Sequence, residues 1–359
     1  MGEGRVNGLA VEVRASDVAF QGYVVSGFRH GKTNFATKLQ PHNNRRKDTD
    51  FSEKIANFAF DMGRKAITLD EQIALLRSRN MTISNEDKAK EILFDVGYFR
   101  MGFYWFPFEQ TYPEKHHRTH QFKDGTDFDS AVKLYYFDFN LRNILLKPLS
   151  RIEIAFRTKV AYLVSNHYVN SPTWFVDTSV VNRKQAASFE RKVYRQILEK
   201  TPLIALHHRH HINDKFAPAW KTLEFMTLGE VVNLFKSLKD EELKLEIANQ
   251  FGIKKLVTFE NYLDIIKNLR NTCAHGNVLY DFTPEKSIRK GPAMKKGIGE
   301  NQNLNGALRV ALYMMRQVSE NRYNDMLTDI DRLISKYGAY PEVKSILTTI
   351  SGLDQLHRK

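Results

Sequence analysis

The sequence has very little cysteine: Cys273 is the only one in 359 residues. An intrachain disulfide is therefore impossible, and a zinc site made of cysteines alone is excluded. Such sparing use of cysteine is typical of a reducing compartment, so we expect a cytoplasmic protein. No stretch approaches the roughly 20 apolar residues that a membrane-spanning helix needs. Residues 1–14 also lack the apolar centre of a signal peptide.

Several common catalytic motifs are absent as well. The sequence has no Gly-x-x-x-x-Gly-Lys phosphate loop, no Gly-x-Ser-x-Gly nucleophile turn and no His-Glu-x-x-His zinc pair. Residues 29–33 (RHGKT) match only the end of a phosphate loop, because the first glycine of that motif is missing. The sequence thus gives no support to these three chemistries.

What the sequence does have is an excess of positive charge. Lys and Arg number 54 against 41 Asp and Glu, which gives a net charge of +13. A polyanionic partner is favoured, with nucleic acid first and an anionic membrane second. Hydrophobic residues make up 42% of the chain and aromatic residues 12%, which argues against wholesale disorder.

The spacing of apolar residues predicts an all-α fold. From Thr68 onwards apolar residues recur at helical intervals, and Thr68–Glu71 and Thr227–Glu230 have the pattern of a capping box. We expect Pro148 to kink or divide a long helical pattern that begins near residue 127. Gly276 is placed to end a helix over residues 259–274.

Four segments follow from this pattern. They are an N-terminal arm of undecided structure (1–63), an N-terminal helical region (64–127), a helical core (128–283), and a Gly- and Lys-rich loop with additional C-terminal helices (284–359). The C-terminal helices are expected at about residues 304–320 and 323–337.

Two clusters of side chains have both a functional and a structural interpretation. Residues 98–108 contain seven aromatic side chains, which could stack on bases but are favoured as a packed core around a loop. Residues 207–211 (HHRHH) could hold a metal. No carboxylate or thiolate lies nearby in the sequence, so a solvated basic loop that touches phosphate is favoured. We expect no metal and no cofactor.

The residues best suited to catalysis lie in the segment NLRNTCAHGN (268–277). Arg270 and His275 are five residues apart, and no other histidine of the 12 has an arginine five positions before it. The spacing alone is weak, since a basic chain of this length should contain about one such pair by chance. An Arg-Asn pair on the last turns of an apolar helix is unusual, because packing would favour apolar residues there. Physical reasoning leaves two interpretations open, a helix C-terminal cap and an active site.

Six segments in order carry a resemblance to a known family. They are KAITLDEQIALLRSR (65–79), VGYFRMGFYW (96–105), LYYFDFNLR (134–142), IEIAFRT (152–158), PAWKTLEFMTLG (218–229) and LRNTCAH (269–275). With these segments the sequence resembles the abortive-infection family of phage-resistance proteins, of the AbiD/AbiF type, within the HEPN superfamily of ribonucleases. It departs from that family at Gly276 and Val278, where a second histidine and a nearby arginine are common.

The resemblance implies a HEPN-like helical bundle and a metal-independent endoribonuclease toxin of anti-phage defence. The catalytic residues would be Arg270, Asn271 and His275. RNA supplies its own nucleophile, the 2′-hydroxyl. Histidine can transfer the protons, arginine can clamp phosphate oxygens, and Asn271 can orient either group. On a straight helix five residues rotate by about 140°, so a site shared between two facing copies, as in HEPN nucleases, is a natural solution.

The expected partners are RNA and a second copy of the chain, without a membrane. In addition to the motif, the candidate RNA contacts are Arg142, Arg157, His208, Arg209 and His210. An RNA could also act as a regulator or inhibitor that restrains the toxin. The alternative function is a non-catalytic protein that holds a structured or regulatory RNA.

Overall fold

The computed structural model describes residues 66–294 and 302–356. The predicted N-terminal arm (1–63) and part of the Gly- and Lys-rich loop (295–301) lie outside the described residues. All described residues belong to one compact unit.

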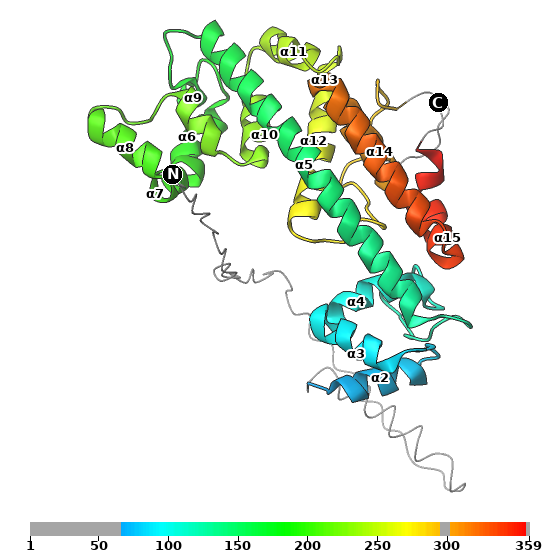
Figure 1. Ribbon diagram of the computed structural model, residues 1–359. Helices are drawn as coiled ribbons and strands as arrows, with labels where there is room; N and C mark the ends of the chain where they lie inside the picture. The colour runs from blue at the N-terminus through cyan, green and yellow to red at the C-terminus, as the bar shows by residue number, and fades with distance from the viewer. Residues whose placement is uncertain (1–65, 295–301, 357–359) are drawn as a thin grey trace, which may run out of the picture. The chain divides into compact units, whose positions relative to one another are not determined.

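The described residues confirm the all-α prediction. They contain helices, short helical turns and isolated bridges, and no strand. The α-helices (Figure 1) are α2 (Leu69–Ser78), α3 (Glu86–Asp95), α4 (Tyr98–Trp105), α5 (Phe128–His167), α6 (Arg183–Phe189), α7 (Arg195–Lys200), α8 (Pro202–His210), α9 (Ala219–Thr222), α10 (Leu228–Ser237), α11 (Glu241–Asn249), α12 (Leu256–Ala274), α13 (Leu304–Val318), α14 (Glu320–Tyr337) and α15 (Pro341–Thr349). Among these residues no helix is both long and apolar enough to cross a membrane.

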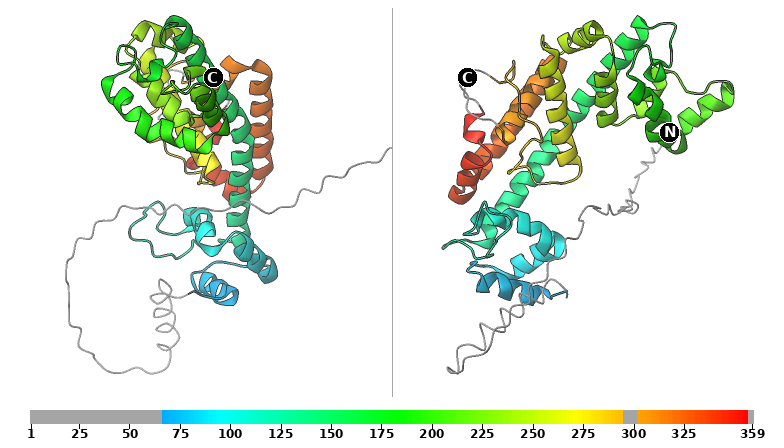
Figure 2. Two further views of the ribbon diagram at one scale, coloured as in Figure 1. Left: turned by 90° about the vertical axis from the view of Figure 1, so that its left-hand side faces the viewer. Right: turned by 180° about the vertical axis from the view of Figure 1, so that it is seen from behind.

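Helix α5 is the element around which the others are arranged. It has 40 residues and begins after the N-cap Asp127. Helices α2–α4 lie at its N-terminal end and α6–α9 at its C-terminal end, while α12, α13 and α14 pack along it (Figures 1 and 2). Pro148 lies inside α5 without dividing it, so that part of the prediction is wrong. Burial of the flanking Leu145 and Leu149 offsets the lost backbone hydrogen bond.

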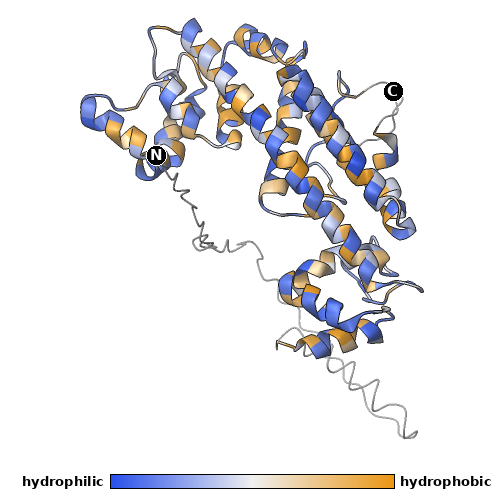
Figure 3. Ribbon diagram, in the orientation of Figure 1, coloured by the Kyte–Doolittle hydropathy of each residue, from blue (hydrophilic) through white to orange (hydrophobic). Residues whose placement is uncertain are grey.

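The core follows the apolar stripe of α5. Leu141, Leu145, Leu149, Ile152 and Phe156 recur at intervals of three and four residues and are at most 1% exposed. This spacing places them on one helix face, and the alternation of apolar and polar residues is visible along the helices in Figure 3. The stripe anchors α12, the helix that carries the predicted motif, against α5.

Local signals in the sequence predicted some elements well and others poorly. Both capping boxes are present, at Thr68 and at Thr227. Residues 98–108 form α4 and a short turn rather than a loop. Tyr104 and Trp105 are buried, which confirms the core interpretation for them, but Phe99 and Phe103 are exposed, so for these two it is wrong. Residues 207–210 end helix α8, so the prediction of a loop there is wrong.

Candidate active site

The predicted motif lies at the C-terminal end of α12. His275 is the C-cap residue, and Gly276 follows with a φ of 66°, as the sequence predicted. The N–H of Gly276 donates to the carbonyl of Cys273 (3.2 Å), and the N–H of Asn277 donates to that of Thr272 (2.9 Å). These two bonds define a Schellman turn, in which one position has a left-handed backbone conformation that favours glycine. The turn leaves the His275 side chain exposed to solvent.

Arg270 is held from the side by an acid on α5. Its Nε lies 3.2 Å from Oε2 of Glu153, and its Nη1 lies 3.4 Å from Oδ1 of Asn271. The side chain of Arg270 is 32% exposed and that of Glu153 is 9% exposed. A guanidinium has five N–H donors in a planar fork, so an acid at the Nε edge leaves terminal N–H groups for an anion.

Glu153 lies between two arginines, and sequence reasoning missed it. Its Oε1 accepts a hydrogen bond of 2.9 Å from Nη2 of Arg157, which also donates to the carbonyl of Met226 (3.0 Å). The structure therefore joins Arg157, a predicted RNA contact, to Arg270 through one carboxylate. A signal was available, because an acid next to the buried Ile152 and four residues before an arginine is unusual on an apolar helix face.

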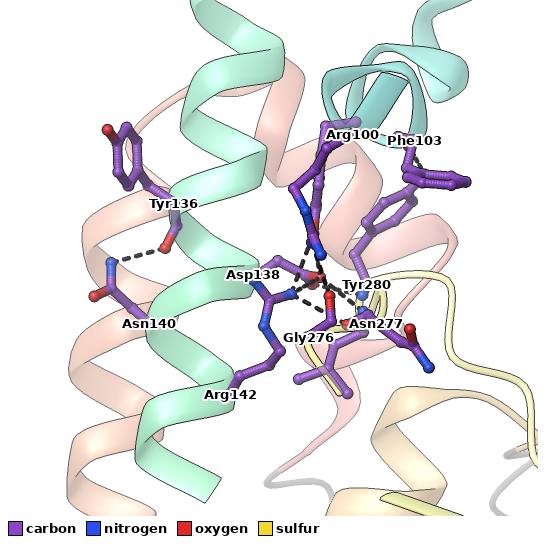
Figure 4. A network of polar contacts seen from close by, with 11 residues as sticks. Arg100, Phe103, Tyr136, Asp138, Asn140, Arg142, Gly276, Asn277 and Tyr280 are labelled. Atoms are coloured by element: carbon purple, nitrogen blue, oxygen red, sulfur yellow. Dashed lines mark hydrogen bonds and ion pairs between the residues drawn. The ribbon is translucent and has the colours of Figure 1, made fainter. Parts of the chain in front are cut away.

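A second buried acid, Asp138, holds the chain that follows the motif (Figure 4). Its Oδ1 accepts from the N–H of Tyr280 and its Oδ2 from the N–H of Leu279, both at 2.7 Å. Oδ2 also accepts from Nη1 of Arg142 (3.0 Å) and from the hydroxyl of Tyr104 (3.1 Å). Burial raises the pKa of Asp138 to about 6, while the backbone N–H groups and Arg142 oppose the shift.

Arg142 belongs to this network and not to an RNA surface. It is 5% exposed, and its Nη1 also donates to the carbonyl of Asn277 (3.1 Å). Arg100 on α4 donates to the neighbouring carbonyl of Gly276 (2.8 Å) (Figure 4). Contact of Arg142 with a phosphate would break a buried ion pair, so we correct that prediction and assign Arg142 to positioning the turn after His275.

Cys273 lies one turn before this segment but is unsuited to be a nucleophile. Its side chain is buried, and burial raises the pKa of its thiol to about 12. The thiolate, the reactive form, is therefore scarce at neutral pH. Of the ionisable residues within 270–277, His275 is exposed and Arg270 is partly exposed, so these two remain accessible.

The histidine cluster on α8 is separate from the motif. His207 is buried, and its Nε2 lies 3.2 Å from Oδ2 of Asp214. Asp214 is only three residues after the cluster, so the expectation that no carboxylate lies nearby is wrong. His208 contacts the hydroxyl of Tyr194 at 2.7 Å. Arg209 and His210 are exposed. None of these contacts reaches α12, and no group of three or more metal-ligating side chains occurs among the described residues.

Comparison with known proteins identifies the family. The family model described as Abi-like protein matches residues 91–281, which is more than half of the chain, and the chain belongs to this family. The matched region contains α5 and α12 together with Glu153, Asp138, Arg270 and His275. Membership points to abortive infection, a form of phage defence. No curated protein and no solved structure matches the chain.

Proposed function

We propose that this protein is a metal-independent endoribonuclease of abortive infection, which cleaves RNA through attack of a 2′-hydroxyl on the adjacent phosphate. The observation that carries the proposal is the end of α12, where the exposed His275 follows an Arg270 whose Nε is held by Glu153. Family membership supports it, because destroying RNA is one way in which an infected cell can be stopped.

The residues suit the chemistry that RNA requires. Attack by the 2′-hydroxyl needs a base, departure of the 5′-oxygen needs an acid, and an imidazole can fill both roles near neutral pH. Charge that develops on the phosphate needs a fixed cation. The buried Glu153 orients Arg270 before substrate binds, so little of the binding energy is spent on ordering it. Asn271 contacts the same guanidinium and adds a second constraint.

We further propose that two copies of the chain form the complete site. Five residues rotate by about 140° along a helix, and no contact joins Arg270 to His275 among the described residues. Two copies that face each other across a twofold axis would surround one phosphate with two histidines and two arginines.

Mixing subunits tests this arrangement. Addition of the double variant Arg270→Ala/His275→Ala to wild type is expected to lower the activity per wild-type subunit, because mixed dimers carry an incomplete site. The measurement is the cleavage rate of a labelled RNA after exchange at several mixing ratios. Activity that tracks only the amount of wild type, or a monomer that cleaves at full rate, would show that one chain carries a complete site.

Independence from metal ions is the expected result of this mechanism. Cleavage should persist in excess EDTA and leave a 2′,3′-cyclic phosphate, because the nucleophile and both proton transfers come from the RNA and from His275. Mass spectrometry of the products identifies the new ends. Inhibition by chelator that zinc reverses would refute the mechanism and direct attention to the histidines of α8.

A non-catalytic RNA-binding protein is the second candidate. The net charge of +13 favours it equally, and Glu153 partly neutralises Arg270. The variant His275→Ala separates the two, since an enzyme should keep RNA binding and lose cleavage. Wild type that binds RNA tightly and never cuts it would favour this alternative.

A further inference from the structure

A groove opens on α5 next to the proposed site. It has a volume of about 550 Å³, and its lining includes Arg157, Thr158, Tyr162 and Asn166 of α5, Trp220 of α9, and Glu224. Helix α9 packs against α5, which brings the two walls together (Figure 1).

Two large aromatic side chains are exposed in this groove. Trp220 is 56% exposed and Tyr162 is 66% exposed. The backbone that carries Trp220 is well packed, because its neighbours Ala219, Thr222 and Leu223 are fully buried. The indole ring of Trp220 and the phenol ring of Tyr162 lie on two different helices and are open to solvent. They provide flat apolar surfaces without a partner in the described part of the chain.

Arg157 connects the groove to the proposed site. Its Nη2 donates to Oε1 of Glu153 (2.9 Å), whose Oε2 lies 3.2 Å from Nε of Arg270. Glu153 and Arg157 are four residues apart on α5, which is about 6 Å along the helix axis. The groove therefore begins about one helical turn from the acid that holds Arg270.

The charge of the lining indicates what the groove accepts. Arg157 and Glu224 are its charged residues, and their Nη1 and Oε1 atoms lie 3.9 Å apart. A lining that is balanced in charge does not attract a run of phosphates. It suits uncharged planar groups with polar edges, because aromatic faces stack on nucleobases while the carboxylate and the Asn166 amide can hydrogen-bond with base edges.

We propose that this groove binds the unpaired nucleobases of single-stranded RNA beside the cleaved phosphate, with Trp220 and Tyr162 as stacking surfaces. The position of the cleaved phosphate rests on the proposed function, whereas the binding of unpaired bases in the groove does not depend on it. Stacking of this kind tolerates many sequences, so the groove would favour unpaired RNA over duplex without selecting one sequence.

The test is a binding measurement that needs no cleavage. A fluorescent 12-nucleotide single strand with 2′-O-methyl groups cannot be cut by the proposed mechanism, and its affinity is read by anisotropy. Trp220→Ala and Tyr162→Ala should each weaken binding about tenfold, whereas Trp220→Phe and Tyr162→Phe should recover most of it. The control is Phe94→Ala, which removes an aromatic ring that is 84% exposed on α3 and should leave affinity unchanged.

An abasic strand of the same length separates base stacking from backbone contacts. It should bind wild type and Trp220→Ala equally. Equal affinity of Trp220→Ala and wild type for the base-containing strand, as a groove for a peptide would give, overturns the proposal. An equal loss on the abasic strand overturns it too. If Trp220→Ala weakens binding of the base-containing strand but wild type never cuts RNA, the proposed function is refuted and the assignment of the groove to nucleobases is kept.

Discussion

His275→Ala is expected to lower the rate of RNA cleavage by about 10²–10⁴-fold, because it removes the group that we propose moves protons at the cleaved phosphate. In cells that express the protein, the same change should abolish growth arrest. The side chain is exposed, so the free energy of unfolding should change by less than about 0.5 kcal/mol. A gel assay of RNA cleavage and a urea titration measure the two effects. The control is His117→Ala, which removes another exposed histidine.

Arg270→Ala should abolish cleavage to a similar extent but with a cost in stability. Glu153 would lose one of its two arginine partners while keeping Arg157, so the free energy of unfolding should fall by about 1 kcal/mol. The matched control is Arg77→Ala, which removes a surface ion pair with Glu86 and should leave cleavage intact. Full activity of either His275→Ala or Arg270→Ala would show that the catalytic site lies elsewhere.

The largest loss of stability is expected for Asp138→Ala. The change leaves the buried guanidinium of Arg142 without its ionic partner and two backbone N–H groups without their acceptor. Breaking a buried pair from one side costs about 3–5 kcal/mol. Chemical denaturation measures this cost. The control is Asp129→Ala on the same helix, which also removes an i,i+4 partner of a basic residue, Lys133, but from the surface, and should cost about 1 kcal/mol or less.

A milder variant tests whether the network also serves catalysis. Arg100→Ala removes one hydrogen bond to the carbonyl of Gly276, directly after His275, and leaves Asp138 and Arg142 paired. It should fold, lose about 1 kcal/mol of stability and cleave RNA more slowly than wild type. Unchanged cleavage by this variant, with the stability loss observed, would show that the turn needs no support from α4.

The fold could be predicted from the sequence wherever the decisive interactions are local. The capping boxes at Thr68 and Thr227 and the stop at Gly276 depend on residues within one turn of each other, and all three are present. Pro148 shows the limit of this reasoning. Its local cost is outweighed by the burial of α5 against other helices, which no short window of sequence contains.

The candidate site likewise has one part that local sequence predicts and another that it does not. Arg270, Asn271 and His275 lie within six residues and are predicted from their spacing and the family resemblance. Glu153 and Asp138 act across long separations, such as the 141 residues between Asp138 and Leu279, and sequence reasoning did not place them. Because sequence reasoning did not place Asp138, it assigned Arg142 to RNA contact. The i,i+4 spacing of each acid from an arginine on α5 was the available signal.

We propose that Arg270 and His275 cleave RNA through its own 2′-hydroxyl. The most direct measurement compares a natural RNA oligonucleotide with one that carries 2′-O-methyl groups at every position, each incubated with purified wild type, Arg270→Ala and His275→Ala. We predict that wild type cuts only the natural strand and that the two variants cut neither. Cleavage of the methylated strand by wild type, or of the natural strand by His275→Ala at the wild-type rate, would contradict the mechanism.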